Sequence, residues 1–182
     1  RKHYFRELSP WIQETLNLFK GKSDVELHVV APNYASNTNV EAERDNIHFH
    51  FYHYSPKWLS SVVAPLIKLF VNHAETFKLA ERFANTLTGF KTPAKNAVRI
   101  IHSINPDIIH LYGSENPDYA APAVRLLGVY PMLLTVQGYA YLQPCRGNLF
   151  ERLFFNYRVK FEEHINKEIK LVTVSKKVSL EE

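Results

Sequence analysis

Short apolar strands alternate with helices along the second half of the chain, and this alternation constrains the fold more than any other sequence feature. Helical spacing and capping signals predict helices over 94–104, 117–127 and 150–168, with strands over 108–112, 132–137 and 170–174. Strands that are short, mostly apolar and separated by helices are typical of a parallel sheet with helices on both faces. The pattern therefore predicts an α/β domain built on a doubly wound, mostly parallel sheet.

The first half of the chain contains the same kinds of element in a less regular order. The sequence predicts a helix from Pro10 to Gly21 capped by Ser9, strands over 25–32 and 47–54 separated by a polar loop over 33–46, and mostly helix from Lys57 to Arg99 with breaks at Pro65, Gly89 and Pro93. A doubly wound sheet normally opens with a central strand, whereas this chain opens with a helix. We expect that strand to precede Arg1 or to be missing, and both ends suggest a piece of a longer protein.

Composition excludes several classes of protein. The 182 residues suffice for one domain with a full hydrophobic core, and 46% hydrophobic with 22% charged residues argues against disorder. The single cysteine, Cys145, excludes a disulfide framework and a cysteine-based zinc site, and it fits a reducing compartment such as the cytoplasm. The sequence contains no apolar run long enough to span a bilayer, and it opens without a signal peptide.

Polar side chains follow two of the predicted strands at the point where each strand ends. The strand at 108–112 leads into Gly113, Ser114, Glu115 and Asn116, and the strand at 132–137 ends in Gln137 and leads into Gly138, Tyr139, Ala140 and Tyr141. Ligands of doubly wound sheets bind beyond the carboxyl ends of the strands. A lone glycine after a strand allows close approach to the backbone, although a turn explains it as well. Two matching strand ends predict a binding edge.

The same segments resemble a known family. PDIIHLYGSE (106–115), LLTVQGY (133–139) and VTVS (172–175), separated by helices, are similar to the N-terminal domain of family-4 glycosyltransferases, which have the GT-B fold of two Rossmann-like domains facing a cleft. The match is good over 93–182 and extends over 1–92 only in layout. The resemblance implies that residues 1–182 form one Rossmann-like, acceptor-side domain. The donor-binding domain, and the glycine-bearing loop after the first strand, are not in this sequence.

Activity and partners are also implied by the resemblance. Intact relatives transfer a sugar from a nucleotide sugar to the hydroxyl of a sugar or lipid-linked acceptor, often in cell-surface polysaccharide biosynthesis, with no bound metal and no cofactor beyond the donor substrate. This half would place the acceptor and contribute polar groups to the cleft, and alone it would be inactive. The expected location is the cytoplasm, with peripheral contact to the inner face of the membrane.

The resemblance also assigns roles to residues at the two strand ends. Gln137 and Glu115 are the predicted catalytic residues, and the predicted substrate-binding residues are Gly113, Ser114, Gly138, Tyr139 and His110. Gln137 lies where many relatives have a histidine, and its amide donates and accepts hydrogen bonds but does not titrate. We therefore expect Gln137 to position a substrate rather than transfer a proton. Tyr139 could stack on a sugar ring, whereas the place of His110 within a strand also fits a packed histidine bonded to backbone.

Two other functions fit parts of the sequence. The GT-B architecture also occurs in sugar-nucleotide epimerases, and a doubly wound domain without catalytic activity binds small ligands or partner proteins.

A metal site is conceivable at His48 and His50, which share a strand face, but the sequence offers no cysteine or carboxylate spaced to complete it.

Residues 57–95 form a basic segment that suggests contact with an anionic membrane. Its net charge of +4 comes from six basic and two acidic residues, namely Lys57, Lys68, Lys78, Arg82, Lys91, Lys95, Glu75 and Glu81. A helix pair that packs on the sheet and exposes its lysines to water explains the same pattern. Nucleic-acid binding is disfavoured, because the charge is modest and no nucleic-acid motif carries it.

Overall fold

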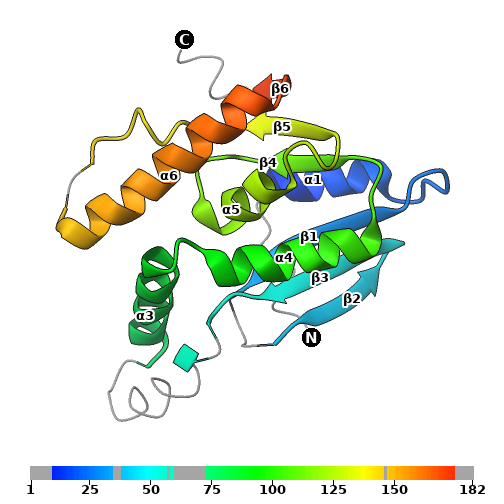
Figure 1. Ribbon diagram of the computed structural model, residues 1–182. Helices are drawn as coiled ribbons and strands as arrows, with labels where there is room; N and C mark the ends of the chain where they lie inside the picture. The colour runs from blue at the N-terminus through cyan, green and yellow to red at the C-terminus, as the bar shows by residue number, and fades with distance from the viewer. Residues whose placement is uncertain (1–9, 35–37, 57, 60–72, 146, 175–182) are drawn as a thin grey trace.

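The computed structural model describes residues 10–34, 38–56, 58–59, 73–145 and 147–174. Over these residues the chain is an α/β protein, as predicted (Figure 1). Its described helices are α1 (Pro10–Phe19), α3 (His73–Leu87), α4 (Lys91–Ile104), α5 (Pro117–Leu126) and α6 (Leu149–Glu168). Its strands are β1 (Leu27–Asn33), β2 (Val40–Arg44), β3 (Ile47–His53), β4 (Ile109–Tyr112), β5 (Met132–Val136) and β6 (Leu171–Val174).

The strands form two three-stranded sheets. Sheet B has the order β4-β5-β6 and is entirely parallel, with Leu111 opposite Leu134 and Leu134 opposite Val172. The strands and helices predicted for the second half of the chain are all present within a few residues. Asn116 caps α5, because its Oδ1 accepts a hydrogen bond from the Asp118 backbone N–H at 3.1 Å.

The break before α4 is real but lies earlier than predicted. Gly89 and Phe90 both have positive φ, 61° and 57°, and α4 begins directly after them at Lys91. Pro93 was expected to mark the break, and this is wrong: it lies in the first turn of α4, where a missing N–H removes no helical hydrogen bond. The buried Phe90 ring packs against Phe154, Tyr157 and Phe161 and fixes this corner against α6.

Sheet A has the order β1-β3-β2 and is mixed, because β3 is parallel to β1 and antiparallel to β2. The polar loop predicted over 33–46 is therefore wrong in part, since β2 occupies residues 40–44. A two-residue turn at Asp45 and Asn46, both with positive φ, returns the chain from β2 into β3. The alternation of Val40, Glu41, Ala42 and Glu43 before this turn was a strand signal.

The two sheets differ in how their faces are covered. Leu16 of α1 packs on one face of sheet A, and Ala97 and Ile100 of α4 pack on the other. In sheet B, Leu111 and Leu134 face α5 and α6. The opposite face of sheet B carries a row of polar contacts instead: His110 Nε2 lies 2.7 Å from Thr135 Oγ1, which lies 2.7 Å from Thr173 Oγ1. Helices on both faces are thus observed for sheet A, and on one face of sheet B within the described residues.

Several predicted features lie outside the described residues. These are the cap at Ser9, the break at Pro65, and the basic residues Lys57 and Lys68. None of the helices in the described part of the chain is long and apolar enough to cross a bilayer.

Candidate functional site

The two polar turns identified in the sequence lie at the same edge of sheet B. β4 and β5 are parallel neighbours, and the Gly113 backbone N–H donates to the carbonyl of Thr135 at 2.8 Å. Arg158 of α6 joins the first turn to the chain just after the second, because its Nε donates to the Glu115 carbonyl at 2.8 Å and its Nη1 to Gln143 Oε1 at 3.1 Å. We call residues 113–116 and 137–141 the lip. Its two turns meet as predicted.

The turn after β4 requires a glycine and leaves one carboxylate oxygen unused. Gly113 has φ of 81°, and a Cβ there would lie 2.5 Å from Glu115 Oε2. Glu115 Oε1 accepts a hydrogen bond from the Tyr119 hydroxyl at 3.0 Å. Burial, together with the nearby charge of Glu115, raises the pKa of Tyr119, so this hydroxyl stays a donor. Glu115 Oε2 is buried and has no hydrogen-bond partner among the described residues.

The turn after β5 contains the second unpaired polar group of the lip. Gln137 follows the last residue of β5, and its Nε2 is buried without a hydrogen-bond partner in the described part of the chain. Gly138 has no positive φ, and a Cβ there would meet no atom within 4 Å. The fold therefore does not require glycine at 138, in contrast to 113.

Glu162 of α6 holds this second turn in place. Its buried carboxylate accepts the Ala140 N–H, 2.9 Å from each oxygen, and the Tyr141 N–H at 3.2 Å. Burial raises the pKa of Glu162, and the two backbone donors oppose that shift. These amides are consequently occupied by the protein. The sequence prediction missed both Glu162 and Arg158; the available signal was two charged residues one helical turn apart on the apolar face of α6.

The remaining predicted site residues are less available to a ligand at the lip. Ser114 is buried, and its hydroxyl donates to Asn166 Oδ1 at 3.2 Å. Tyr139 is half-buried against the core of sheet B, with its ring 5.2 Å from that of Tyr141. His110 lies away from the turns, stacked on Tyr112 at 4.0 Å between ring centroids. Its ring bonds to the Thr135 side chain rather than to backbone, and partial burial lowers its pKa.

A cluster of tyrosines around Asp118 occupies the neighbouring carboxyl ends of β1 and β3. The hydroxyls of Tyr34 and Tyr54 donate to the two Asp118 oxygens at 2.5 and 2.8 Å, and the Tyr52 hydroxyl donates to the Asp118 carbonyl at 2.9 Å. Burial raises the pKa of Asp118, and the bonds from Tyr34 and Tyr54 oppose that shift. We call these four residues the tyrosine–aspartate cluster. It joins sheet A to the first turn of α5.

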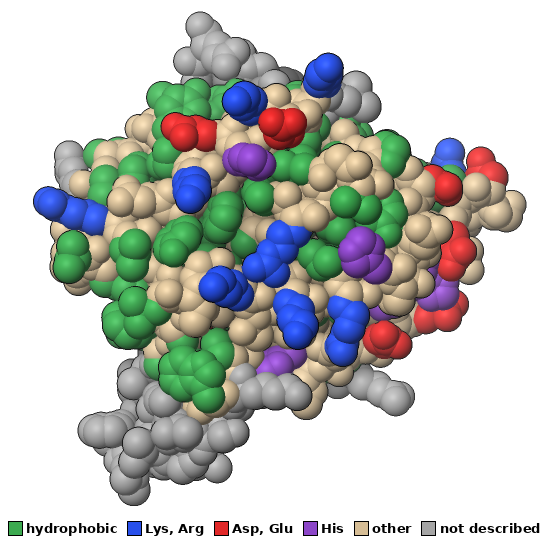
Figure 2. Space-filling view, viewed as in Figure 1, with side chains coloured by type: hydrophobic (Ala, Val, Ile, Leu, Met, Phe, Trp, Pro, Cys, Tyr) green, Lys and Arg blue, Asp and Glu red, His purple; other side chains and the backbone are tan. Residues whose placement is uncertain are grey.

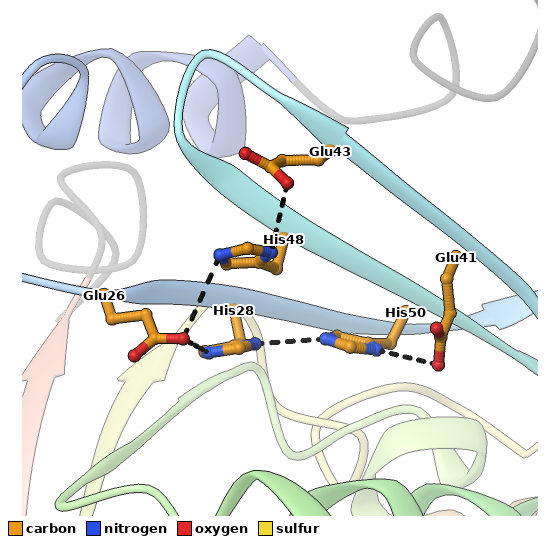
Figure 3. A network of polar contacts seen from close by, with 6 residues as sticks. All are labelled: Glu26, His28, Glu41, Glu43, His48 and His50. Carbon is orange, nitrogen blue, oxygen red and sulfur yellow. Dashed lines mark hydrogen bonds and ion pairs between the residues drawn. The ribbon is translucent and has the colours of Figure 1, made fainter.

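Three histidines on one face of sheet A form a network with glutamates (Figure 3). His28 Nδ1 lies 3.0 Å from His50 Nε2, and His28 Nε2 lies 3.0 Å from Glu26 Oε1. His48 and His50 also contact carboxylates, at 3.8 Å to Glu43 and 3.5 Å to Glu41. Carboxylates are therefore near, contrary to the sequence prediction, because the missed strand β2 brings them beside β3. No group with the geometry of a metal site occurs among the described residues.

Among the described residues, the lip has an unpaired donor, Gln137 Nε2, and an unpaired acceptor, Glu115 Oε2, on adjacent turns. An amide N–H₂ and a carboxylate oxygen are together suited to hydroxyl groups, which accept one hydrogen bond and donate another. Buried polar atoms without a partner elsewhere in the described residues include Ser55 Oγ and Asn85 Oδ1, near the end of β3. Buried polar groups are normally hydrogen-bonded, so an unpaired pair at a sheet edge is consistent with a polar ligand.

Comparison with protein-family models, with curated protein sequences and with solved structures gave no match to this chain.

Proposed function

We propose that this chain is the acceptor-binding half of a glycosyltransferase, a Rossmann-like, doubly wound domain of a GT-B enzyme. One observation carries the proposal: Gln137 Nε2 and Glu115 Oε2, on turns that meet at the carboxyl edge of parallel strands, are buried and lack partners within the described residues. That edge is where α/β sheets bind ligands, and the two atoms offer what a sugar hydroxyl needs. The resemblance of residues 106–115 and 133–139 to family-4 glycosyltransferases agrees with it.

In the proposed reaction, an acceptor hydroxyl attacks the anomeric carbon of the donor sugar. The new C–O bond forms as the bond to the nucleotide diphosphate breaks, and the hydroxyl proton leaves with the departing phosphate or to solvent. Gln137 would hold the acceptor hydroxyl in place, and Glu115 would accept its hydrogen bond and orient the oxygen lone pair. The partner domain would bind the diphosphate and neutralise its charge.

The test is sugar transfer by the chain joined to its donor-binding domain. Gln137→Ala should lower kcat about a hundredfold, because one positioned hydrogen bond at the reacting hydroxyl is lost. The matched control is Gln143→Ala, a glutamine at the rim whose partner is Arg158 rather than a free site. Unchanged turnover in Gln137→Ala, or equal losses in both variants, would remove Gln137 from the reaction.

Ligand binding by the 182-residue chain separates the alternatives. NMR titration with a panel of nucleotide sugars and of sugar acceptors should perturb the lip only with an acceptor. Perturbation by a nucleotide sugar alone would favour a sugar-nucleotide epimerase. Perturbation by neither class would favour a domain that binds other small ligands or a partner protein.

A specific surface also favours contact with an anionic membrane. Lys91, Lys95 and Arg99 are exposed at four-residue intervals on α4, which contains no acidic residue, and Arg125 of α5 donates to the Lys91 carbonyl at 3.4 Å. Figure 2 shows basic side chains across the middle of this face and hydrophobic ones beside them. Leu79, Phe83 and Leu87 are exposed on α3 at the same spacing. Basic and apolar side chains on one face are typical of peripheral membrane binding.

Liposome flotation tests this second proposal. The chain should float with vesicles that contain phosphatidylglycerol and not with neutral vesicles, and salt should release it. The triple variant Lys91→Glu, Lys95→Glu, Arg99→Glu should lose binding, whereas Lys160→Glu on α6 should retain it. Equal binding of both variants would refute a role for the α4 face.

A further inference from the structure

The histidine network of sheet A has one ring on β1 and two on β3 (Figure 3). The His28 ring stacks on the rings of His48 and His50, with centroids 4.8 and 5.3 Å apart and interplanar angles of 20° and 23°. His28 lies near the start of β1, whereas the lip lies beyond the carboxyl ends of β4 and β5. The network is therefore separate from the lip, and the proposed function does not use it.

The hydrogen bonds of His28 determine which of its nitrogens carries a proton. A carboxylate only accepts hydrogen bonds, so His28 Nε2, which lies 3.0 Å from Glu26 Oε1, carries a proton and donates it. His28 Nδ1 lies 3.0 Å from His50 Nε2, and a bond between two ring nitrogens needs one N–H and one lone pair. Neutral His28 has its only ring proton on Nε2, so its Nδ1 accepts from His50. A second proton on His28 would remove that lone pair and break the bond.

The other two rings have nitrogens that face carboxylates. His50 Nδ1 is buried, has no hydrogen-bond partner among the described residues, and lies 3.5 Å from Glu41 Oε1. A lone pair on this nitrogen would face an oxygen that also only accepts, whereas a proton there could be donated to it. His48 lies between two carboxylates, with its Nδ1 3.8 Å from Glu43 and its Nε2 3.9 Å from Glu26. Both rings therefore have a place for an extra proton, which the third ring lacks.

The neighbouring elements bring other titratable groups toward the network. α4 contributes apolar side chains to the cavity that His28 lines, and β4 contributes His110. Partial burial lowers the pKa of His110, so this ring stays neutral to lower pH than an ordinary histidine. His102, in the last turn of α4, contacts Tyr130 instead, and Arg44 of β2 lies on the opposite face of the sheet. Among the described residues, the charged groups that contact the three rings are thus the three glutamates.

We propose that the histidine network is a pH-operated clamp on β2, an edge strand of sheet A. As the pH falls, His50 takes up a proton from solvent and pairs with Glu41. His48 does the same with Glu43, while His28 stays neutral and keeps its bond to His50. Backbone bonds hold β2 to β3 on one side only, so the two ion pairs should strengthen its attachment. Because the clamped state binds more protons than the open one, lower pH favours it. The clamp is independent of glycosyl transfer.

NMR of the isotope-labelled chain tests the order of protonation, because the two nitrogens of each ring report separately on which of them carries a proton. Imidazole rings change their charge in the range from about pH 8 to about pH 5. On going from about pH 8 to about pH 6, His48 and His50 should become doubly protonated, whereas His28 should remain neutral with its proton on Nε2. A doubly protonated His28 at the lower pH, or a neutral ring at either of the other two positions, would overturn the proposal.

Hydrogen exchange of the β2 amides tests the clamp itself. Their protection factors, which are corrected for the intrinsic pH dependence of exchange, should rise about threefold over the same pH range, as expected of two exposed ion pairs. The double variant Glu41→Gln, Glu43→Gln should lose this rise, whereas Glu163→Gln, at an exposed position on α6, should keep it. An unchanged protection factor of β2 in the wild type, or an equal rise in both variants, would overturn the proposal.

Discussion

The tyrosine–aspartate cluster and the lip lie at carboxyl ends of strands, yet they use their polar groups differently. In the cluster, three tyrosine hydroxyls all donate to Asp118, two to its carboxylate and one to its carbonyl. In the lip, Glu115 and Gln137 each retain a buried polar atom without a partner in the described residues. Both regions combine the carboxyl ends of parallel strands with side chains of a helix, so topology does not explain the contrast.

The contrast separates polar residues that stabilise the fold from polar residues that are available to a ligand. A buried polar group without a partner destabilises a protein, so it persists where something else pairs with it. In the cluster, all three hydroxyls already have hydrogen-bond partners, and their bonds connect β1, β3 and α5. In the lip, two buried polar atoms have no partner among the described residues, although Glu162 and Arg158 bond to several of its backbone groups. Stability and ligand binding should therefore respond to substitution in opposite ways in the two regions.

The largest effect should come from removing the acceptor at the centre of the cluster. Asp118→Ala leaves the Tyr34 and Tyr54 hydroxyls buried without their acceptor, and bonds to a charged group contribute about 1.5–3 kcal/mol each. We expect the free energy of unfolding in urea to fall by at least about 3 kcal/mol. Asp107→Ala, at an exposed position near the start of β4, is the control and should change it by less than about 0.5 kcal/mol. Similar losses of unfolding free energy in the two variants would show that the tyrosine bonds to Asp118 do not stabilise the fold.

Within the cluster, the tyrosines should rank by the acceptor that each one uses. Tyr54→Phe removes a bond to the carboxylate and should destabilise by about 2 kcal/mol. Tyr52→Phe removes a bond to a backbone carbonyl and should destabilise by about 1 kcal/mol. Urea unfolding of both variants measures the order. The reverse order would mean that the charge of Asp118 contributes little.

Local signals in the sequence predicted the elements of the second half of the chain and the approach of the two turns. Asn116, Pro117 and Gly128 delimit α5 through capping and backbone preferences that act within a few residues. β2 was missed because its alternation is short and polar on one side, although Asp45 and Asn46 marked the turn. Such features are readable because their causes are local.

The contacts that distinguish the two regions depend on the tertiary structure and were not predictable. Tyr34 and Asp118 are 84 residues apart, and Glu162 reaches a turn 22 residues before it. The sequence placed Asp118 in the first turn of a helix, where a carboxylate is ordinary, and gave no sign that tyrosines from β1 and β3 surround it. Similarly, Ser114 looked like a rim residue, but the fold directs it to Asn166.

The pH dependence of stability should show that Glu162, which supports the second turn of the lip, is structural. Burial raises the pKa of Glu162 above its ordinary value, so the folded state keeps this proton to higher pH than the unfolded state. The contribution of Glu162 to stability should therefore rise as pH falls through its folded pKa, and level off below the unfolded pKa. Urea unfolding measures this in the wild type and in Glu162→Gln from pH 7 to pH 4. The free energy of unfolding of the wild type, relative to that of the variant, should increase as the pH falls. A constant difference would contradict this.

The smallest effect on stability should come from the residue with the largest expected effect on turnover. Gln137 Nε2 has no partner in the described chain, so Gln137→Ala removes a desolvated amide without breaking a hydrogen bond. We expect the free energy of unfolding to change by less than about 0.5 kcal/mol. Urea unfolding of this variant, beside Asp118→Ala, is the measurement. A loss above about 1.5 kcal/mol would mean that the amide is already paired within the protein, as the tyrosines are. The lip would then be a second structural cluster, and its free donor, the basis for placing an acceptor there, would not exist.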